Sequence, residues 1–289
     1  RCLVTGGAGF IGSNLVKELL NNLDKILFGY GIRNARLLSS RNYLHDTRIS
    51  FIALQWLTSW GGINSVTRKE ASQLFELFLQ DTSTTNSTSY SSTSLLSQLV
   101  IGLAQPKSGE VILDPCVGHG SFLLEAQRAI EWSVEGFLSQ TAFYGFDVSA
   151  EPLLIAVIRL LLSGSHNYHL EHKDALDESY FSSKSSKLFD IVLAHPPAGL
   201  RNENYRELAY QQNFPVITKD AVGMFIQQAL ALLKPNGRAV IAVPEGFLFG
   251  KNHSDVELRR YLVESGFVEV VVRIPPKILI ENSWIGGAL

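Results

Sequence analysis

The sequence predicts an α/β fold built on a doubly wound, mainly parallel sheet, and three observations support this prediction. From Leu95 onward, short apolar segments alternate with segments that have the apolar spacing of helices. Two unusual turns, Asp114–Phe122 and Ala194–Ala198, each follow an apolar strand-like segment. The carboxyl ends of parallel strands meet at one edge of an open sheet, where ligands bind. We therefore expect both turns to lie at a single ligand-binding edge.

The composition is that of a folded protein with a substantial core, since 46% of the 289 residues are hydrophobic and 18% are charged. The net charge of −2 argues against a large basic surface that holds DNA unaided. Cys2 and Cys116 lack the spacing of metal ligands, so we expect no metal site. We find no signal peptide and no apolar run near the roughly 20 residues of a membrane span. These features favour a cytoplasmic protein that has no membrane partner.

Both ends of the chain resemble the ends of a fragment. The sequence starts at Arg1 without a methionine, and it stops at Leu289, where residues 284–289 begin to resemble a strand. We therefore interpret the chain as a fragment that lacks a C-terminal region.

The first 94 residues are predicted to form three zones. Residues 1–20 have the pattern of a strand, a glycine turn and a helix, and residues 21–80 are predicted to be mostly helical, with the best helix at 68–79. Residues 81–94 are almost all Ser and Thr, and such a run has little apolar surface to bury. We predict a linker there and place the domain boundary in it.

The predicted elements alternate regularly in the second domain, residues 95–289. Helices are predicted at 95–103, 122–129, 153–162, 224–233 and 254–265, and strands at 111–113, 143–146, 168–170, 189–194, 238–243 and 268–274. The run Lys234–Gly237 contains Pro, Asn and Gly, which is typical of a helix end.

Three acidic residues follow three successive predicted strands and indicate a nucleotide-like cofactor. Asp114 ends the first strand and is followed by Gly118 and Gly120, which let a backbone come close to a ligand at a helix N-terminus. Asp147 ends the second strand, where an acidic residue commonly binds ribose hydroxyls, and Asp174 follows the third. Alternatively, Asp114 and Asp147 are helix N-caps.

Residues 95–289 resemble the catalytic domain of N6-adenine DNA methyltransferases, above all the modification subunit of type I restriction–modification systems. The matching run is Asp-Pro-x-x-Gly-x-Gly-x-Phe, and the segment Phe225–Phe249 is also similar. The resemblance implies a Rossmann-like methyltransferase fold and S-adenosylmethionine as cofactor. The cofactor-binding positions that it implies are Asp114, Pro115, Gly118, Gly120, Phe122, Asp147 and Asp174.

The resemblance also implies a catalytic motif, Asn/Asp-Pro-Pro-aromatic, which here is His195-Pro196-Pro197-Ala198. In the family, the first side chain and a proline carbonyl accept hydrogen bonds from the adenine amine, and the aromatic ring stacks on the flipped base. A neutral His195 accepts one such bond through its bare nitrogen, whereas Ala198 cannot stack. Phe214 or another nearby aromatic is a candidate substitute. Two interpretations stay open: a divergent but working methyltransferase, and a decayed subunit that serves cofactor binding or assembly.

The resemblance implies double-stranded DNA as substrate, with a specificity subunit that selects the target and a restriction subunit as further partners. A second departure from the family concerns the loop that covers the cofactor. Ser92-Thr93 occupies the place of the family's usual Thr-Pro pair, and Tyr90 is a candidate to pack near the cofactor.

The first 20 residues resemble a different family, the NAD-dependent sugar-nucleotide epimerases and dehydratases. Gly6, Gly9 and Gly12 match the glycine turn of that family, and Tyr180 and Lys184 match its Tyr-x-x-x-Lys pair. An isolated strand, turn and helix cannot hold a dinucleotide, because that ligand spans two halves of a complete sheet. We interpret this piece as a truncated graft and the Tyr–Lys pair as a coincidence, with an NAD-dependent epimerase as the alternative.

Overall fold

The computed structural model describes residue 76 and residues 94–133, 141–163, 165, 167–176, 188–204, 206–207, 213–276, 278 and 287–289. The chain divides into two units, residues 1–78 and 79–289, and all described residues except Glu76 belong to the second. The predictions for residues 1–20, for 21–80 apart from the helical Glu76, for 81–93 and for the Tyr180–Lys184 pair therefore lie outside the described residues. The last residue of the predicted linker, Ser94, begins a helix.

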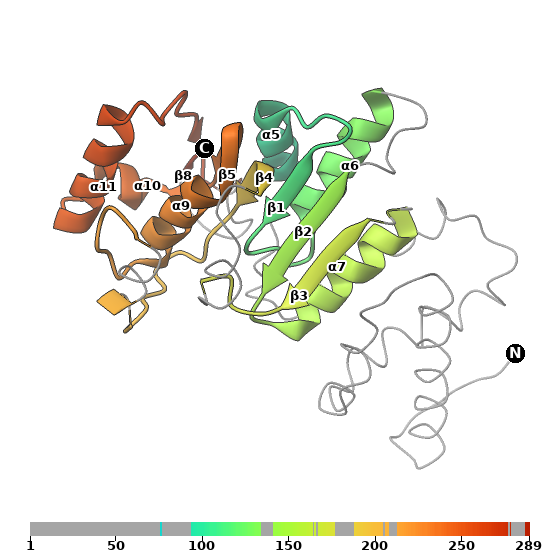
Figure 1. Ribbon diagram of the computed structural model, residues 1–289, viewed down its shortest axis with the longest axis horizontal. Coiled ribbons are helices and arrows are strands. Elements are labelled where there is room, and N and C mark those ends of the chain that lie inside the picture. The colour runs from blue at the N-terminus through green and yellow to red at the C-terminus, as the bar shows by residue number, and fades with distance from the viewer. Residues whose placement is uncertain are drawn as a thin grey trace, which may run out of the picture. The chain divides into compact units, whose positions relative to one another are not determined.

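The second unit is organised around a five-stranded parallel sheet with the strand order β3-β2-β1-β4-β5 (Figure 1). Its strands are β1 (Val111–Asp114), β2 (Ala142–Asp147), β3 (Tyr168–His172), β4 (Phe189–Ala194) and β5 (Leu233–Ile241). The helices associated with it are α5 (Ser94–Ala104), α6 (Ser121–Ser133), α7 (Ala150–Ser163) and α9 (Ala221–Leu232). The prediction of a doubly wound parallel sheet is confirmed.

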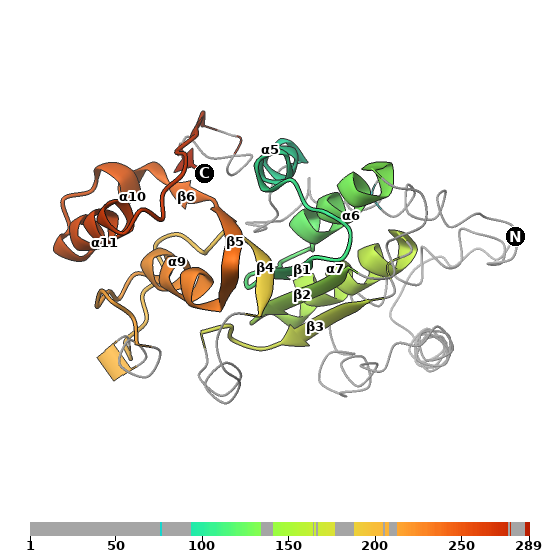
Figure 2. The ribbon, with the colours of Figure 1, turned by 45° about the horizontal axis from the view of Figure 1, so that its top comes forward.

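The strand order reverses direction at β1, and this reversal sets the faces that the helices cover. The chain runs from β1 through β2 to β3 toward one edge, and from β4 to β5 toward the other. Because crossovers between parallel strands are right-handed, the two directions place their helices on opposite faces. Accordingly, α6 and α7 cover one face together with α5, whereas α9 packs against β4 and β5 on the other (Figures 1 and 2). Ligands of such folds bind at the reversal point.

The core consists of apolar side chains between these layers. Strands β1 and β4 are buried almost throughout, as expected for central parallel strands covered on both faces. On the α9 face, Phe146, Phe189, Val192 and Phe225 belong to one cluster of buried side chains. The core therefore encloses the strand ends that carry the candidate residues.

Two elements near the end of the chain differ from the sequence predictions. Strand β5 begins at Leu233 rather than at Arg238, and a register shift between Phe189 and Ile191 in its pairing with β4 accommodates the extra residues. Asn236 adopts a positive φ of 65° in this stretch, a conformation that Asn tolerates better than most residues. Helix α9 thus ends just before the Lys234–Gly237 run, as predicted. The Pro-Asn-Gly residues themselves lie within β5.

The prediction of a strand at 268–274 is wrong for most of these residues. Only β7 (Arg273–Ile274) forms, in a small antiparallel sheet with β8 (Gly287–Ala288) and β6 (Val243–Pro244). Val272 and Leu289 exchange two further hydrogen bonds, with N–O distances of 3.0 and 2.9 Å. Val268, Val270 and Val271, which precede this pair in the chain, are exposed.

Two short helices follow β6. The helix predicted at 254–265 is confirmed as α11 (His253–Glu264), and the sequence did not predict α10 (Glu245–Phe249). The Arg259 side chain joins them, because its guanidinium donates to the backbone oxygens of Phe247 and Gly250. In the part of the chain that the structure describes, no helix has both the length and the apolar character required to span a membrane.

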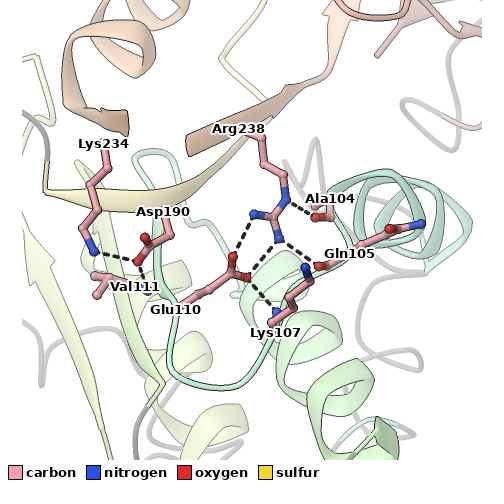
Figure 3. A network of polar contacts seen from close by, with 8 residues as sticks. All are labelled: Ala104, Gln105, Lys107, Glu110, Val111, Asp190, Lys234 and Arg238. Carbon is pink, nitrogen blue, oxygen red and sulfur yellow. Dashed lines mark hydrogen bonds and ion pairs between the residues drawn. The ribbon is translucent and has the colours of Figure 1, made fainter. Parts of the chain in front are cut away.

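A network of polar contacts holds together the edge of the sheet opposite to the strands' carboxyl ends (Figure 3). The Arg238 guanidinium forms a two-pronged contact with Glu110, with N–O distances of 2.8 and 2.9 Å. The same group donates to the backbone oxygens of Ala104 and Gln105, at the end of α5. Beside it, Asp190 accepts from Lys234 and from the Val111 backbone, both at 2.8 Å. Arg238 thus ties β5 to the segment that connects α5 with β1.

We predict that Arg238→Ala lowers the free energy of unfolding by about 2–3 kcal/mol, because paired hydrogen bonds to a half-buried carboxylate and two carbonyl contacts are lost together. Denaturant titration of the purified chain measures this difference. The control is Arg128→Ala, which removes a single exposed pair to Glu125 at 3.5 Å and is expected to cost less than about 0.5 kcal/mol. Equal losses in the two variants would contradict the structural role of Arg238.

Candidate functional site

The turn after β1 is held against the end of β2 by backbone hydrogen bonds. The Val117 N–H donates to the Phe146 oxygen at 2.9 Å, and the Gly118 N–H donates to Oδ2 of Asp147, also at 2.9 Å. The turn then closes with a 2.7 Å bond from the Gly120 N–H to the Val117 oxygen. Gly118 and Gly120 have φ values of 49° and 74°, which favour glycine. The two glycines that the sequence singled out are therefore required by the backbone path of the turn.

Gly120 also lies against helix α7. A Cβ atom at Gly120 would come within 2.9 Å of the Ala156 Cβ, so no larger side chain fits without movement of the backbone. Arg159, on the same helix, donates to the His119 oxygen at 2.6 Å and to Ser121 Oγ at 3.1 Å. The turn and the start of α6 are thus positioned by α7.

Asp147 does not cap a helix. Its Oδ2 accepts from Gly118, and its Oδ1 accepts at 2.8 Å from the Ser149 N–H, which precedes the first residue of α7. Asp114 likewise accepts from the Cys116 N–H at 3.1 Å within the turn. The N-cap alternative is therefore not supported for either residue. Asp147 stays half-buried, and a carboxylate has acceptor capacity beyond two hydrogen bonds.

Asp114 is a buried carboxyl group with an unusual pKa. Its side chain is 2% exposed, and burial, together with the nearby Asp147, raises its pKa to about 8. Among the described residues, neither Asp114 nor Asp147 forms an ion pair with Lys, Arg or His. The edge of the sheet thus carries two adjacent carboxyl groups that pair with no basic side chain in the described part of the chain.

Asp174 is exposed and lies in the turn directly after β3. Its Oδ1 accepts from the Leu176 N–H at 2.9 Å. The preceding residue, Lys173, donates from its backbone to the Asp147 oxygen at 2.9 Å, and His172 lies opposite Asp147 in the β2–β3 register. Asp114 and Asp147 are therefore the last residues of β1 and β2, and Asp174 follows β3, so the three lie at the carboxyl ends of adjacent strands, as predicted.

The second turn, at the end of β4, lies next to the first. Strands β1 and β4 are neighbours, and the His195 backbone N–H donates to the Cys116 sulfur. Burial lowers the pKa of the His195 imidazole to about 4, so this ring is neutral at neutral pH. Pro196 is buried, Pro197 is half-buried and Ala198 is exposed. The structure thus brings the two sequence motifs together at the carboxyl ends of β1 and β4.

Three predicted site residues have side chains directed into the protein interior. Phe122 is 2% exposed, and Pro115 is buried as well. Phe214, considered as a substitute for the missing stacking ring, is also buried and packs in the cluster that contains Phe189 and Phe225. It exposes too little of its ring to stack on a base, which removes it as a substitute.

Cys116 completes the description of the turn. It is a free thiol, and burial beside Asp114 raises its pKa well above the ordinary value, so the sulfur stays protonated. Within the described ranges, no group of three or more His, Cys, Asp or Glu side chains is arranged to hold a metal ion.

Two residues that position the turn after β1, Arg159 and Gly145, were not predicted from the sequence. Arg159 was not recognised because an Arg in an amphipathic helix has no distinctive local pattern. Gly145 lies in β2, where an added Cβ would meet Leu170 at 2.7 Å and Val117 at 2.9 Å. A glycine inside a predicted strand signals such close approach, and this signal was available from the sequence.

The reversal point of the sheet, the glycine turn and the adjacent acidic edge define a Rossmann-like methyltransferase fold. A solved structure with this architecture, the type I restriction-modification system methyltransferase subunit from Streptococcus thermophilus, matches with a TM-score of 0.62 at 22% identity. That match covers 76% of this chain and 48% of the other.

The sequence model of the N-6 DNA Methylase family matches residues 67–287, and the chain belongs to this family. The match begins upstream of residue 95, where the predicted methyltransferase domain starts.

Curated relatives are methylase subunits of type I restriction enzymes. The EcoEI methylase subunit of Escherichia coli is 24% identical over 286 residues, which covers 94% of this chain and 57% of the relative. The EcoKI methylase subunit of Escherichia coli strain K12 is also 24% identical, over 78% of this chain and 44% of the relative. The chain spans about half the length of the curated relatives it matches.

We predict that Gly120→Ala destabilises the protein by about 2 kcal/mol or more, because the new methyl group meets Ala156 and the residue must keep a positive φ. The control is Gly102→Ala in α5, where nothing lies within 4 Å of the added Cβ. This change is expected to stabilise the helix by about 0.5–1 kcal/mol. Thermal and denaturant unfolding measure both. A neutral Gly120→Ala would show that the turn does not need this conformation.

A second prediction concerns the pH dependence of stability. Because the folded-state pKa of Asp114 is about 8 and the ordinary value is 3.8, the folded protein holds a proton that the unfolded chain releases in this window. The contribution of Asp114 is therefore complete below pH 4 and is lost as the pH rises through 8. Asp114→Asn has no proton to lose. Its stability relative to the native protein should rise by about 2 kcal/mol or more between pH 5 and pH 9. A difference that stays constant across this range would contradict the buried proton.

Proposed function

We propose that this chain binds S-adenosylmethionine at the carboxyl ends of β1, β2 and β3 and methylates N6 of adenine in DNA. The observation that carries the proposal is the parallel pairing of β1 with β4, which places the Asp114–Phe122 turn and the His-Pro-Pro turn at neighbouring strand ends. A cofactor held by the first turn then lies beside a base held by the second. Membership in the N-6 DNA Methylase family supports this assignment.

The residues present fit this cofactor. S-adenosylmethionine carries a sulfonium and an ammonium group, and the edge offers the half-buried Asp147 carboxylate, which forms no ion pair among the described residues. Asp147 and Asp174 lie at adjacent strand ends, which suits the ribose and the adenine of one nucleoside. When bound, the cofactor supplies an electrophilic methyl group.

The protein's own task is to hold the target amine. The lone pair of an adenine amine is delocalised into the ring, so acceptors that hold the amino hydrogens favour its reaction. The neutral His195 ring offers one bare nitrogen for this purpose, and its low pKa keeps that nitrogen unprotonated at neutral pH. Pro196 and Pro197 fix the backbone of the turn, so that a proline carbonyl is available as the second acceptor.

We extend the proposal to the assembly. The net charge of −2 does not provide a broad DNA-binding surface, and curated relatives are subunits of type I restriction enzymes. A specificity subunit would therefore select the target in double-stranded DNA, and a restriction subunit would be a further partner. We place this protein in the cytoplasm, where its DNA substrate lies.

A second candidate function is a subunit that binds the cofactor and assembles but does not catalyse. It is favoured by Ala198, whose methyl group cannot stack on a base, and by the burial of Phe214. Base flipping costs a few kcal/mol of lost stacking, and an aromatic ring in the enzyme normally compensates for it.

The test is a methylation assay on adenine-containing DNA, with the purified chain and its specificity subunit. We expect slow transfer in the native protein and an increase of about 10-fold or more in His195→Asn plus Ala198→Phe, because the ring restores about 1–3 kcal/mol of stacking. Product analysis should show N6-methyladenine.

Calorimetry completes the test. Native protein should bind S-adenosylmethionine and not NAD, and Asp147→Ala should lose about 10-fold or more in affinity because hydrogen bonds to a charged group are removed. Binding without methylation, followed by activity in the double variant, would select the assembly function. Absence of S-adenosylmethionine binding would sink both candidates.

A further inference from the structure

Helix α9 carries two adjacent buried glutamines, Gln227 and Gln228, which contact different loops of the candidate site. The Gln227 amide forms hydrogen bonds to Val216, in the segment before α9, and to Gly223 within the helix. It accepts from the Val216 N–H at 2.8 Å and donates to the oxygens of Val216 and Gly223 at 3.0 and 3.1 Å.

Gln228 contacts the other loop. Its Nε2 donates to the backbone oxygen of Ala175, which is 53 residues away in sequence and directly follows Asp174. The next residue, Leu176, donates its N–H to the Asp174 carboxylate at 2.9 Å. The side chain of Gln228 is thus linked, through one short turn, to the acidic group at the end of β3.

The side-chain oxygen of Gln228 lacks a hydrogen-bond partner among the described residues. This atom, Oε1, is buried and accepts no hydrogen bond from the described residues, while Gln228 as a whole is 2% exposed. An unpaired buried amide oxygen costs free energy that an apolar side chain of similar size avoids. Its neighbours Phe225, Ala229 and Leu232 all belong to an apolar cluster. A polar side chain at this position therefore does little for stability.

We propose that Gln228 is a positioning residue for cofactor selectivity: it fixes the Asp174 turn so that the carboxylate accepts a hydrogen bond from the adenine amino group of the cofactor. This inference rests on the proposed function, since it takes Asp174 as the residue that contacts adenine. Helix α9 then sets both halves of the site, Gln228 on the cofactor side and Gln227 on the target side.

The test uses two stable ligands, S-adenosylhomocysteine and S-inosylhomocysteine. They differ in the purine, where the 6-amino donor of adenine becomes an oxo acceptor and N1 gains a proton. The native protein should prefer the adenosyl ligand by about 10- to 100-fold, the value of a hydrogen bond to a charged acceptor. Gln228→Met keeps the length and the volume of the side chain. It should reduce this preference at least about 3-fold. The melting temperature should change by less than about 3 °C, because the unpaired Gln228 Oε1 is removed while the Ala175 oxygen loses its donor. Should Gln228→Met fail to fold, Gln228→Asn retains the amide but cannot reach Ala175, and it should show the same loss.

The matched control is Gln227→Met. It leaves both backbone groups of Val216 without this partner, so it should lower the melting temperature and leave the adenosyl-to-inosyl ratio unchanged. A folded Gln228 variant that keeps the native ratio overturns the inference alone. A native protein that binds neither ligand overturns the proposed function and the inference with it.

Discussion

The hydrogen bond between the Gly118 backbone and the Asp147 carboxylate is the constraint on which the rest of the site depends. It joins the turn after β1 to the end of β2, two segments that parallel pairing brings alongside each other but does not connect. Once this bond and the neighbouring Val117–Phe146 bond form, Gly120 lies against Ala156 and helix α6 starts in a defined direction. The Cys116 sulfur is then placed to accept from His195, and the two turns of the site become neighbours.

The backbone of the site therefore matches the methyltransferase pattern more closely than the side chains proposed to contact the target base. The glycines, the proline pair and the strand register form the geometry of a methyltransferase of the N-6 DNA Methylase family. The proposed function assigns His195 and Ala198 to the target base, and at these two positions the sequence departs from the Asn/Asp-Pro-Pro-aromatic pattern that the resemblance implies. A scaffold can persist while its reactive groups change, because packing constrains glycines and core residues much more tightly than exposed positions such as Ala198.

The sequence predicted most of this architecture from local patterns. Periodicity and the acidic strand ends were sufficient for the five parallel strands and for the placement of Asp114, Asp147 and Asp174 at one edge.

The failures have physical causes that a local pattern does not contain. Val268–Val272 has the composition of a strand, but pairing depends on a distant backbone, here that of Leu289. The short helix α10 is held at its end by Arg259 from the next helix, and Phe214 is a core residue because of what packs around it. Arg159 and Gln228 act through contacts 38 to 53 residues away, so the sequence held no sign of their roles.

The Arg238 network has a consequence for how the protein is made. Its partners Ala104 and Glu110 precede Arg238 by 134 and 128 residues, so they leave the ribosome well before it. At about 5–20 residues per second, translation separates these events by roughly 6 to 27 seconds. During that interval the end of α5 and the Glu110 carboxylate face water without the cation that later joins them, while β1, β2 and β3 are already available to pair. The polar network at this edge of the sheet therefore forms only after β5 has been synthesised.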